Sequence, residues 1–357
     1  MINLEGNQIH RRKTREISVG KVLVGGNNPI RVQTMTTPKT VDTDAVVAQV
    51  LQMETAGCDI VRITVNDQEA ADALPSILSR INIPVVADVH FDYRMALSAL
   101  DHEVGCVRIN PGNIGAEWKT LEVMKKAADR GKSIRIGVNA GSLEKPLLKK
   151  YGHPTPEALV ESALAQIELF EKSNFYNFKL SIKSSDVISN YRAYMLLSAQ
   201  TEAPLHVGVT ESGTKNYGTV KSSVGIGSLI LSGIGDTIRV SLSTDPVEEV
   251  KVGVFMLKSM GLRSDTPEII SCPSCGRADI DVYKLAEEVE RRALGLKKNI
   301  KIAVMGCVVN GPGESMEADI GIAGGKGEGL VYKKGKPLKK VPEAQMLEFL
   351  MSEIERM

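Results

Sequence analysis

The sequence predicts an α/β fold in which a (β/α)8 TIM-type barrel is followed by a small α+β domain. Short apolar runs alternate with amphipathic helical stretches from about residue 30 to residue 261. Eight strands, each followed by a helix, over about 230 residues are the count and size of this barrel. The alternation stops after Gly261, where a polar, proline-ended linker covers residues 263–267. We therefore expect domains at residues 1–262 and 263–357 of the 357-residue chain.

The apolar runs that we expect to form the barrel strands cover residues 30–34, 60–65, 84–90, 106–110, 134–139, 178–183, 205–210 and 237–241. Amphipathic patterns predict helices at 43–56, 117–130, 156–172 and 246–260. Residues 17–19 and 22–24 flank Gly20-Lys21, which predicts a hairpin capping the barrel bottom. The alternative fold, a doubly wound sheet, lacks its dinucleotide fingerprint because Ile230 replaces the third glycine after Gly225 and Gly227.

The second domain has its own sequence of elements. We expect strands at 268–271, 300–305, 319–323 and 330–333, and helices at 281–294 and 342–356. The glycine-rich residues 324–329 lie between two predicted strands and not before a helix. A hairpin turn is therefore the better interpretation than a phosphate-binding loop.

Composition and charge restrict the class of function. The chain has 44 Lys and Arg against 43 Asp and Glu, a net charge of +1, whereas a general nucleic-acid binder carries a basic excess. No run of 18 apolar residues is present, so we expect no membrane-spanning helix. Residues 1–15 are polar and lack the apolar core of a secretory signal, so we expect a cytoplasmic protein.

Five of the predicted barrel strands carry a cation. These residues, which we call the barrel cations, are Arg62, Arg108, Arg135, Lys183 and Arg239. Strands of a parallel barrel are covered by helices outside, so these side chains must point inward, near the carboxyl-terminal mouth. Structural ion pairs explain one or two of them. The excess over local carboxylates predicts an anionic ligand with several phosphate oxygens.

The two-residue period of a strand adds polar residues to the same faces. Asn110 shares a face with Arg108, His90 with Asp88, Asn139 with Arg135, Ser181 with Lys183, and Ser241 with Arg239. Glu211 directly follows the seventh predicted strand. Together with the barrel cations, Asn110, Asn139, Ser181 and Ser241 form the predicted substrate-binding set.

The five cysteines fall into two kinds. Cys58 and Cys106 lie in apolar runs and are expected to be buried small hydrophobes. Cys272-x-x-Cys275 and Cys307 allow three interpretations: a zinc site, a redox pair and an iron–sulfur cluster. A zinc site lacks a fourth Cys or His, and a redox pair leaves Cys307 unused. A cluster with three thiolates agrees best, because clusters tolerate a fourth ligand of another kind.

The motifs around these cysteines resemble the 4-hydroxy-3-methylbut-2-enyl diphosphate synthase family of the methylerythritol phosphate route to isoprenoids. The resemblance rests on Cys-Pro-Ser-Cys-Gly-Arg at 272–277, Met-Gly-Cys-Val-Val-Asn-Gly-Pro-Gly-Glu at 305–314, Val-Gly-Val-Thr-Glu-Ser-Gly at 207–213 and Ala-Asp-Val-His at 87–90. It covers essentially the whole chain. The chain has no room for the extra domain of plant-type members and is similar to the compact bacterial two-domain form.

The resemblance implies a substrate-binding barrel and a C-terminal domain, similar to sulfite reductase domains, that holds a [4Fe–4S] cluster. Cys272, Cys275 and Cys307 would be the thiolate ligands, and Glu314 the labile fourth ligand. The implied reaction opens the ring of 2-C-methyl-D-erythritol 2,4-cyclodiphosphate with two electrons and loss of water, giving (E)-4-hydroxy-3-methylbut-2-enyl diphosphate. Reduced flavodoxin or ferredoxin would be the electron donor.

Within that reaction we expect Glu211, or His90 oriented by Asp88, to deliver protons. Asp88 and His90 as a purely structural pair are the alternative. Two other classes of function remain open from the residues alone: a zinc-stabilised barrel hydrolase, and a non-catalytic sensor of a phosphate ligand.

Chain connectivity predicts a homodimer with the site shared between chains. The last barrel helix runs antiparallel to the eighth strand, so the linker begins at the face opposite the mouth. Its eleven residues, 261–271, reach at most about 36–40 Å. We therefore expect the cluster domain of one chain to cover the barrel of another, which is also the family's arrangement. The lysine-rich residues 333–340 are expected either to attract an acidic electron donor or to be a solvated turn.

Overall fold

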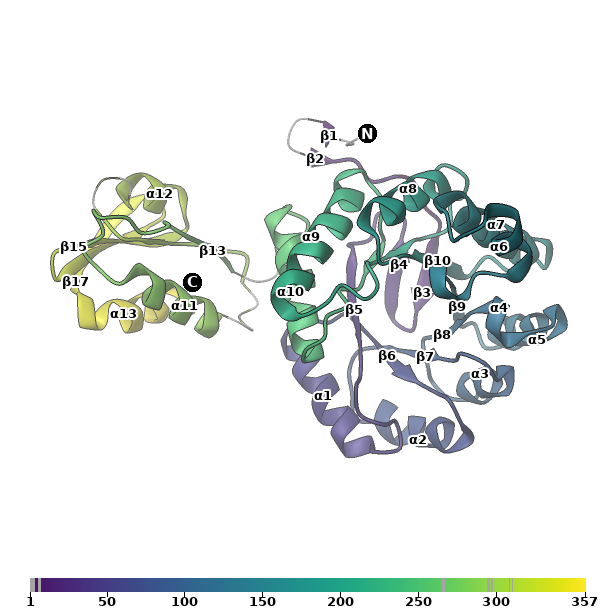
Figure 1. Cartoon of the computed structure of the whole chain (residues 1–357). Helices are drawn as coiled ribbons and strands as arrows, with labels where there is room; N and C mark the ends of the chain where they lie inside the picture. Colours follow the sequence, from purple (N-terminus) through teal and green to yellow (C-terminus); the bar gives the residue numbers. More distant parts are fainter. Residues whose placement is uncertain are drawn as a thin grey trace. The chain divides into compact units, whose positions relative to one another are not determined.

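The computed structural model describes residues 4–5, 8–264, 267–293, 296, 298–307, 309 and 311–357. The chain divides into two compact units, Met1–Leu257 and Lys258–Met357. Figure 1 shows a barrel in the first unit and a sheet covered by helices in the second. Among the described residues, no helix combines the length and apolarity needed to cross a membrane.

The first unit is the predicted barrel. Its strands are β5 (Arg31–Met35), β6 (Ile60–Thr64), β7 (Val85–Asp88), β8 (Cys106–Ile109), β9 (Ser133–Asn139), β10 (Phe178–Lys183), β11 (His206–Val207) and β12 (Thr237–Ile238). They pair in the order β10-β9-β8-β7-β6-β5-β12-β11, in parallel throughout. A parallel bridge between Leu180 and Leu205 brings β10 beside the start of β11 and nearly closes the barrel.

Three strands are markedly shorter than predicted. We expected a strand at 84–90, but β7 covers only Val85–Asp88, so His90 follows the strand. We expected strands at 205–210 and 237–241, but β11 and β12 end at Val207 and Ile238. After β11 the chain turns away from the ladder, and the Thr210 N–H donates to the carbonyl of Ser184, beyond the end of β10. Arg239, Ser241 and Glu211 therefore lie in loops at the strand ends and not in the strands themselves.

An outer ring of helices surrounds the strands (Figure 1). The helices are α1 (Thr43–Thr55), α2 (Gln68–Leu78), α3 (Tyr93–Leu100), α4 (Pro111–Ile114), α5 (Glu117–Asp129), α6 (Lys145–Tyr151), α7 (Pro156–Lys172), α8 (Val187–Ser198), α9 (Lys215–Leu231) and α10 (Pro246–Ser259). Asp42, Asp67, Asp92 and Asp186 cap their helices by accepting a backbone N–H, which satisfies donors that the first turn leaves free. The four predicted helices are confirmed to within one residue.

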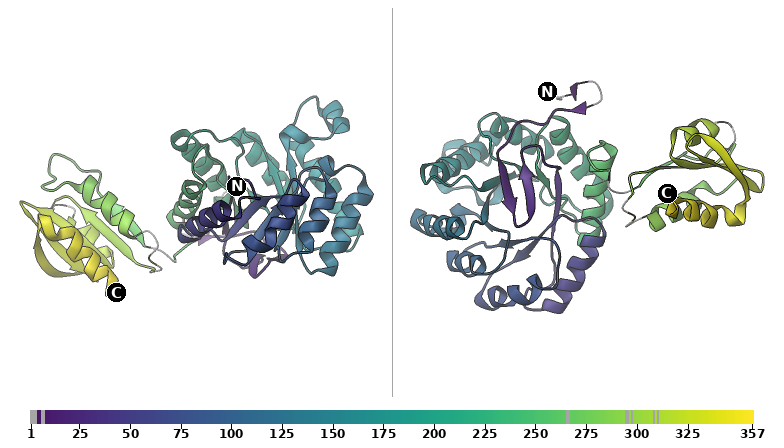
Figure 2. Two further views of the ribbon diagram at one scale, coloured as in Figure 1. Left: turned by 90° about the horizontal axis from the view of Figure 1, so that it is seen from below. Right: turned by 180° about the vertical axis from the view of Figure 1, so that it is seen from behind.

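A hairpin precedes the barrel. The short pair β1 (Leu4–Glu5) and β2 (Gln8–Ile9) is followed by β3 (Glu16–Val19) and β4 (Val22–Gly25), which are antiparallel. Ile17, Val19 and Val24 pack with Ile60, Val86 and Cys106 of the inner strands. Gly20 turns the hairpin with a φ of 56° and lies against Gly105, just before β8 begins. The right view of Figure 2 shows this hairpin across the end of the barrel, where we predicted a cap.

The second unit is a five-stranded sheet with helices on both faces. Its order is β13 (Glu268–Ser271), β14 (Lys301–Met305), β15 (Ile320–Gly325), β16 (Glu328–Lys333) and β17 (Lys336–Pro342). Ile302 and Val304 pack in a core with α11 (Val282–Ala293) and α13 (Met346–Glu355). Ala303 and Met305 point to the other face, and α12 (Gly311–Glu317) contacts β14 and β15.

The predictions for this unit were incomplete. The glycine-rich stretch is the expected hairpin turn, since β15 and β16 pair antiparallel up to Gly325 and Glu328. We predicted neither α12 nor β17. Three lysines and two prolines mask the strand pattern of β17, and it forms because an edge strand has an exposed face where lysine is tolerated. The last helix begins at Met346 and not at Pro342, because β17 ends at Pro342 and a 3-10 turn over Glu343–Gln345 follows it.

Candidate active site

Charged residues occupy neighbouring positions on the inner wall of the barrel. The register pairs Lys179 of β10 with Arg135 of β9, Arg135 with Arg108 of β8, and Arg108 with Asp88 of β7. Paired residues of parallel strands point to the same side. Arg62 and Lys183 join them from β6 and β10. The structure thus brings Arg62, Asp88, Arg108 and Arg135 together, as the sequence predicted.

Asp88 is the central carboxylate of this group. It is 1% exposed, and its oxygens lie 3.4 Å from Arg62 Nε, 3.2 Å from Arg108 Nη1 and 3.1 Å from His90 Nε2. Burial alone would raise the pKa of Asp88. The charge of Arg62, the hydrogen bond with His90 and the charge of Arg108 outweigh burial and lower this pKa far below its usual range.

His90 has two competing partners at one ring nitrogen. Its Nε2 lies 3.1 Å from Asp88 Oδ2 and 2.8 Å from Arg108 Nη1. The carboxylate can only accept and the guanidinium can only donate. His90 Nε2 therefore donates to Asp88 when protonated and accepts from Arg108 when not. With its side chain 42% exposed, His90 is accessible to a ligand.

Positive charge exceeds negative charge inside the barrel. Among the ion pairs of the described residues, Asp88 pairs with Arg62 and Arg108, and Glu249 of α10 pairs with Arg239 at 3.5 Å. Arg135, 1% exposed, has no ion pair among the described residues, and its Nε and Nη1 have no hydrogen-bond partner. Burial and the charges of Arg62 and Arg108 lower the pKa of Arg135 well below its usual value. An anion would supply the missing partner.

Lys183 lies at the end of β10, and its ammonium group faces a histidine. Its Nζ is 3.3 Å from His206 Nε2. Burial and the nearby charges of Arg135 and Arg239 lower the pKa of Lys183 well below its usual value. Burial and Arg62 likewise lower the pKa of Arg239, which Glu249 partly offsets. A bound phosphate would favour the charged form of each of these groups.

Two glycines leave space for these side chains. A Cβ at position 137 would lie 2.8 Å from Arg108 Nε, and one at position 208 would lie 3.1 Å from Lys183 Nζ. A side chain at 137 would push against the Arg108 guanidinium, and one at 208 would also come within 2.6 Å of the Arg239 carbonyl. Gly137 in β9 and Gly208 after β11 therefore help to shape the site.

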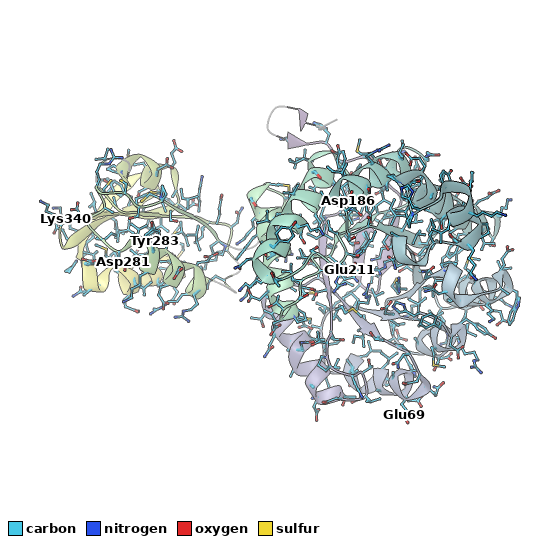
Figure 3. All side chains as sticks on the ribbon, in the orientation of Figure 1. Glu69, Asp186, Glu211, Asp281, Tyr283 and Lys340 are labelled. Atoms are coloured by element: carbon cyan, nitrogen blue, oxygen red, sulfur yellow. The ribbon has the colours of Figure 1, made fainter. Side chains whose placement is uncertain are left out.

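The predicted polar partners are placed differently from one another. Asn110 caps α4 by accepting the Gly112 N–H at 3.1 Å, and the Asn139 amide oxygen accepts from Arg108 Nη2 at 3.2 Å. Ser181 is buried and lies within 3.5 Å of the Ile136 carbonyl, whereas Ser241 is half-buried beyond β12. Glu211 is exposed and has a φ of 52°, in the left-handed region. Figure 3 labels Glu211 within the ring of helices.

A cavity of about 280 Å³ opens beside Asp88 and His90. It is lined by Thr64, Val65, Asn66, Asp88, His90, Phe91 and Asp92. These residues follow β6 and β7 at their carboxyl ends, which is where barrel enzymes place their sites. Phe91 is 74% exposed and lies directly after His90. The cavity gives a small ligand access to both members of the Asp88–His90 pair.

Sequence reasoning missed Lys179, His206 and Glu249. Lys179 is fully buried, its Nζ has no hydrogen-bond partner, and it shares the two-residue period of Ser181 and Lys183. That period could have identified it. Glu249 is buried, accepts from Thr34 Oγ1 at 2.5 Å and from the Leu242 N–H at 2.8 Å, and reaches these partners from helix α10 and not from a strand. No local signal marked it.

The second unit contains the three cysteines of interest. Cys272 follows β13 and Cys307 follows β14, and these neighbouring parallel strands end at the same edge of the sheet. Cys272 Sγ accepts a hydrogen bond from the Gly306 N–H at 3.3 Å. In the turn between Cys272 and Cys275, Ser274 has a φ of 52°. The Tyr283 hydroxyl donates to the Pro273 carbonyl at 3.0 Å, and Figure 3 labels Tyr283 on this unit.

Arg277 provides positive charge near two of the thiols. Its backbone and side-chain hydrogen bonds lower the pKa of the Cys275 thiol, and the charges of Cys275 and Cys307 both act on Arg277. Glu314 is exposed in the first turn of α12, a helix whose Gly311 N–H donates to the Cys307 carbonyl at 3.1 Å.

This donor set suits an iron–sulfur cluster. In the part of the chain that the structure describes, no three His, Cys, Asp or Glu residues converge on one metal ion. A cluster spreads its thiolate ligands over different irons, and backbone N–H groups donate to its sulfurs. Three thiols beside one sheet edge, with Gly306 and Arg277 as donors, meet that requirement. Cys58 and Cys106 are buried, as predicted.

Comparison with known families gives two matches that cover most of the chain. The family model described as "GcpE TIM-barrel domain" matches residues 14–254. The model described as "GcpE protein C-terminal domain" matches residues 268–356.

Relatives are similar over nearly their full length. A protein of Geobacillus thermodenitrificans is 54% identical, covering 98% of this chain and 93% of the relative. One of Caldanaerobacter subterraneus subsp. tengcongensis is 55% identical, covering 97% of this chain and 98% of the relative. Both are named 4-hydroxy-3-methylbut-2-en-1-yl diphosphate synthase (flavodoxin).

Among solved structures, an N-acetylneuraminic acid synthetase of Leptospira borgpetersenii has a TM-score of 0.51 at 15% identity. It covers 79% of this chain and 98% of that protein. At this identity the similarity supports the fold alone.

Proposed function

The chain belongs to the GcpE family, and from this premise we propose that it converts 2-C-methyl-D-erythritol 2,4-cyclodiphosphate to (E)-4-hydroxy-3-methylbut-2-enyl diphosphate. The family expected from the motifs is confirmed, and its relatives are named as enzymes. In the proposed reaction the substrate takes up two electrons and two protons. Its ring C–O bond to phosphate breaks, and one hydroxyl leaves as water.

The observation that carries this proposal is the uncompensated positive charge inside the barrel. Arg135 and Lys183 are buried, and neither forms an ion pair within the described residues. A diphosphate offers several oxygens to such groups, and guanidinium groups bind phosphate through two parallel hydrogen bonds. Arg62, Arg108 and Arg239 complete the proposed diphosphate site, with Asn110, Asn139, Ser181 and Ser241 as polar contacts.

These cations also have a role when the ring opens. Breaking the C–O bond leaves new negative charge on a phosphate oxygen. Donors held in place before the reaction stabilise such charge strongly in a site with little water. Asp88 holds Arg62 and Arg108, and Glu249 holds Arg239, so their orientation does not depend on the substrate.

Two groups are proposed to handle protons. His90 can pass the proton at Nε2 because Asp88 and Arg108 compete for that atom. Glu211 is exposed in a loop that follows β11. We propose that one of them protonates the leaving hydroxyl. Asp88 orients His90 and stays ionised.

We propose that Cys272, Cys275, Cys307 and Glu314 hold a [4Fe–4S] cluster. When bound, the cluster supplies low-potential electrons and an iron that can act as a Lewis acid. The thiols lie beside one sheet edge near Arg277 and Gly306, and the hydrogen bonds of Arg277 lower the pKa of the Cys275 thiol. Glu314 lies on the helix that follows Cys307, so it can reach or leave the same neighbourhood by a side-chain movement.

The proposed partners follow from the family. Relatives named for flavodoxin support reduced flavodoxin as the donor, with ferredoxin as an alternative. We propose a homodimer in which each site takes its barrel from one chain and its cluster domain from the other. In support, α10 returns antiparallel to β12, so Ser259 lies at the end of the barrel where the strands begin. A cytoplasmic location is part of the same proposal.

The decisive experiment combines cofactor content with turnover. The protein is purified without oxygen, and iron, sulfide and zinc are measured. We expect about four irons per chain. Turnover of the cyclic diphosphate is followed by mass spectrometry with reduced flavodoxin and with a chemical reductant. Zinc without iron would favour the hydrolase, and a cluster without turnover would favour the sensor.

Two variants separate the parts of the proposal. Glu314→Ala should keep its iron but alter the cluster spectrum and lower turnover. Arg135→Met should keep both the iron and the spectrum but lose affinity for the cyclic diphosphate. An unchanged spectrum and rate for Glu314→Ala would make Glu314 an ordinary surface carboxylate.

A further inference from the structure

His206 is a buried histidine in β11 that faces Lys183 at the end of β10, and the proposed chemistry does not use it. Its side chain is fully buried. Nε2 lies 3.3 Å from Lys183 Nζ, and Nδ1 lies 2.8 Å from Thr237 Oγ1 on the neighbouring strand β12. Its carbonyl accepts a hydrogen bond from the Tyr194 hydroxyl at 2.6 Å, which fixes the backbone from α8. Both ring nitrogens and the main chain are thus held.

The surroundings of Lys183 leave His206 as its hydrogen-bond partner. The charged groups that act on Lys183 are Arg135, Arg239, Arg62 and Arg108, all of the same sign. None of the ion pairs found among the described residues includes Lys183. Gly208, two residues after His206, leaves the space that Lys183 occupies. Without an acceptor, repulsion from four guanidinium groups would move this ammonium group out of place.

The hydrogen-bond chemistry selects one form of the imidazole. A protonated lysine can only donate a hydrogen bond, so His206 Nε2 must accept it with a free lone pair. The ring proton of His206 is then on Nδ1, and this N–H donates a hydrogen bond to Thr237 Oγ1. Burial and the charges of Lys183, Arg135, Lys179 and Arg62 lower the pKa of His206 well below its usual value, which keeps the ring neutral.

We propose that His206 is a positioning residue: as a neutral Nδ1–H imidazole held by Thr237, it orients Lys183 Nζ toward the phosphate oxygens bound at the barrel mouth. The identity of that anion as the cyclic diphosphate rests on the proposed function. The pairing of His206 with Lys183 does not.

The first test reads the imidazole directly. The chain has 5 histidines, so selective ¹⁵N labelling gives a small set of ring signals, and His206→Gln identifies the one that belongs to His206. We expect a neutral Nδ1–H tautomer from pH 6 to pH 8 that shifts when inorganic pyrophosphate is added. An Nε2–H tautomer, or a ring that becomes protonated in this range, would overturn the proposal.

The second test is a double-mutant cycle on ligand affinity. His206→Leu should weaken binding of the cyclic diphosphate about tenfold, as expected for a lost hydrogen bond to a charged group. Added to Lys183→Met, it should cause no further loss, because its effect passes through Lys183. His206→Gln retains an acceptor and should recover most of the affinity.

A merely structural role predicts a different outcome. Leu74→Ala on α2 also removes fully buried volume but lies away from Lys183, so its effect should add to that of Lys183→Met. If His206→Leu is additive in the same way, or if His206→Gln recovers nothing, the proposal is wrong. The cycle is repeated with inorganic pyrophosphate. Wild-type protein that binds pyrophosphate but not the cyclic diphosphate would refute the proposed function and leave the pairing standing.

Discussion

Lys179 shows how a single residue can oppose the stability of the barrel that contains it. It is fully buried in β10, its Nζ has no partner, and Arg135 is its register neighbour. Burial is the main cause that lowers the pKa of Lys179 to about 8. Unfolded lysine titrates near 10.4. Below pH 8 the folded barrel must therefore hold a charge that the unfolded chain solvates more easily.

The sign of the pH dependence follows from this difference. Between about pH 8 and pH 10 the unfolded chain binds more protons than the folded one, so this residue makes stability rise with pH. Lys179→Met should raise the free energy of unfolding at pH 7 by at most about 3 kcal/mol. The gain should disappear near pH 10. Urea unfolding at both pH values measures it, with the exposed Lys215→Met as the control. Destabilisation at pH 7 would show that Lys179 has a partner.

The residues of the site differ in how far the sequence could reveal them. A cation in a strand of a parallel barrel has one direction open to it, so Arg62, Arg108 and Arg135 could be placed from the period alone. Glu249 could not, because it reaches Arg239 from a helix, and no local spacing links a helix residue to a strand end. His206 lies in a short strand whose burial appears only once β10 and β12 are paired with it.

At the scale of elements, strand β9 depends on one glycine to hold its neighbour's cation. The Arg108 guanidinium lies over Gly137, where a Cβ would come within 2.8 Å of Nε. Gly137→Ala should displace Arg108 from Asp88 and Asn139 and weaken substrate binding about tenfold, through the loss of hydrogen bonds to a charged group. Gly227→Ala on α9 is the matched control, because nothing lies within 4 Å of its Cβ. Equal affinities for the two variants would contradict this account.

The lysine-rich edge strand has two ends that lie at opposite ends of the sheet. Lys336 pairs with Lys333, which pairs with Ile320 near the start of β14. Lys340 pairs with Leu330, and Ala323 links this row to Met305, at the end of β14 where Cys307 follows. Figure 3 labels Lys340 on this strand. In the sequence, residues 333–340 are one basic run, but in the structure the length of β17 separates the two ends of this run.

This separation sharpens the docking prediction. Lys339→Glu with Lys340→Glu should slow flavodoxin-supported turnover roughly tenfold at low salt, because steering by charge acts on the association rate. Turnover with a small chemical reductant should not change. Lys334→Glu with Lys336→Glu makes the same change of charge at the other end and serves as the control. If both pairs slow turnover alike, net charge and not a docking site is responsible.

At the scale of the whole molecule, each of the two units folds around its own core. The change of rhythm after Gly261 lies close to the division between Leu257 and Lys258. The barrel was predictable because its strands are short, mostly apolar runs that alternate with helices. The second unit was less predictable, because α12 begins with Gly311, Pro312 and Gly313, which are poor helix formers. It forms because Gly311 and Ser315 pack closely against β15.

The last prediction concerns how two such units make one site. The barrel carries the candidate anion site, and the second unit carries the cysteines. In the proposed reaction, electrons must pass between them over a short distance. Because α10 ends where the barrel strands begin, the linker starts at the end opposite the mouth. We therefore expect one chain's cysteines to serve another chain's barrel.

Cys307→Ser and Arg239→Met should each be inactive alone, and mixing them should restore up to about a quarter of wild-type activity, since half of the dimers are mixed and each has one intact site. Subunit exchange is verified by mass spectrometry of differently tagged chains. A mixture that exchanges fully but stays inactive would mean that each site is built within a single chain.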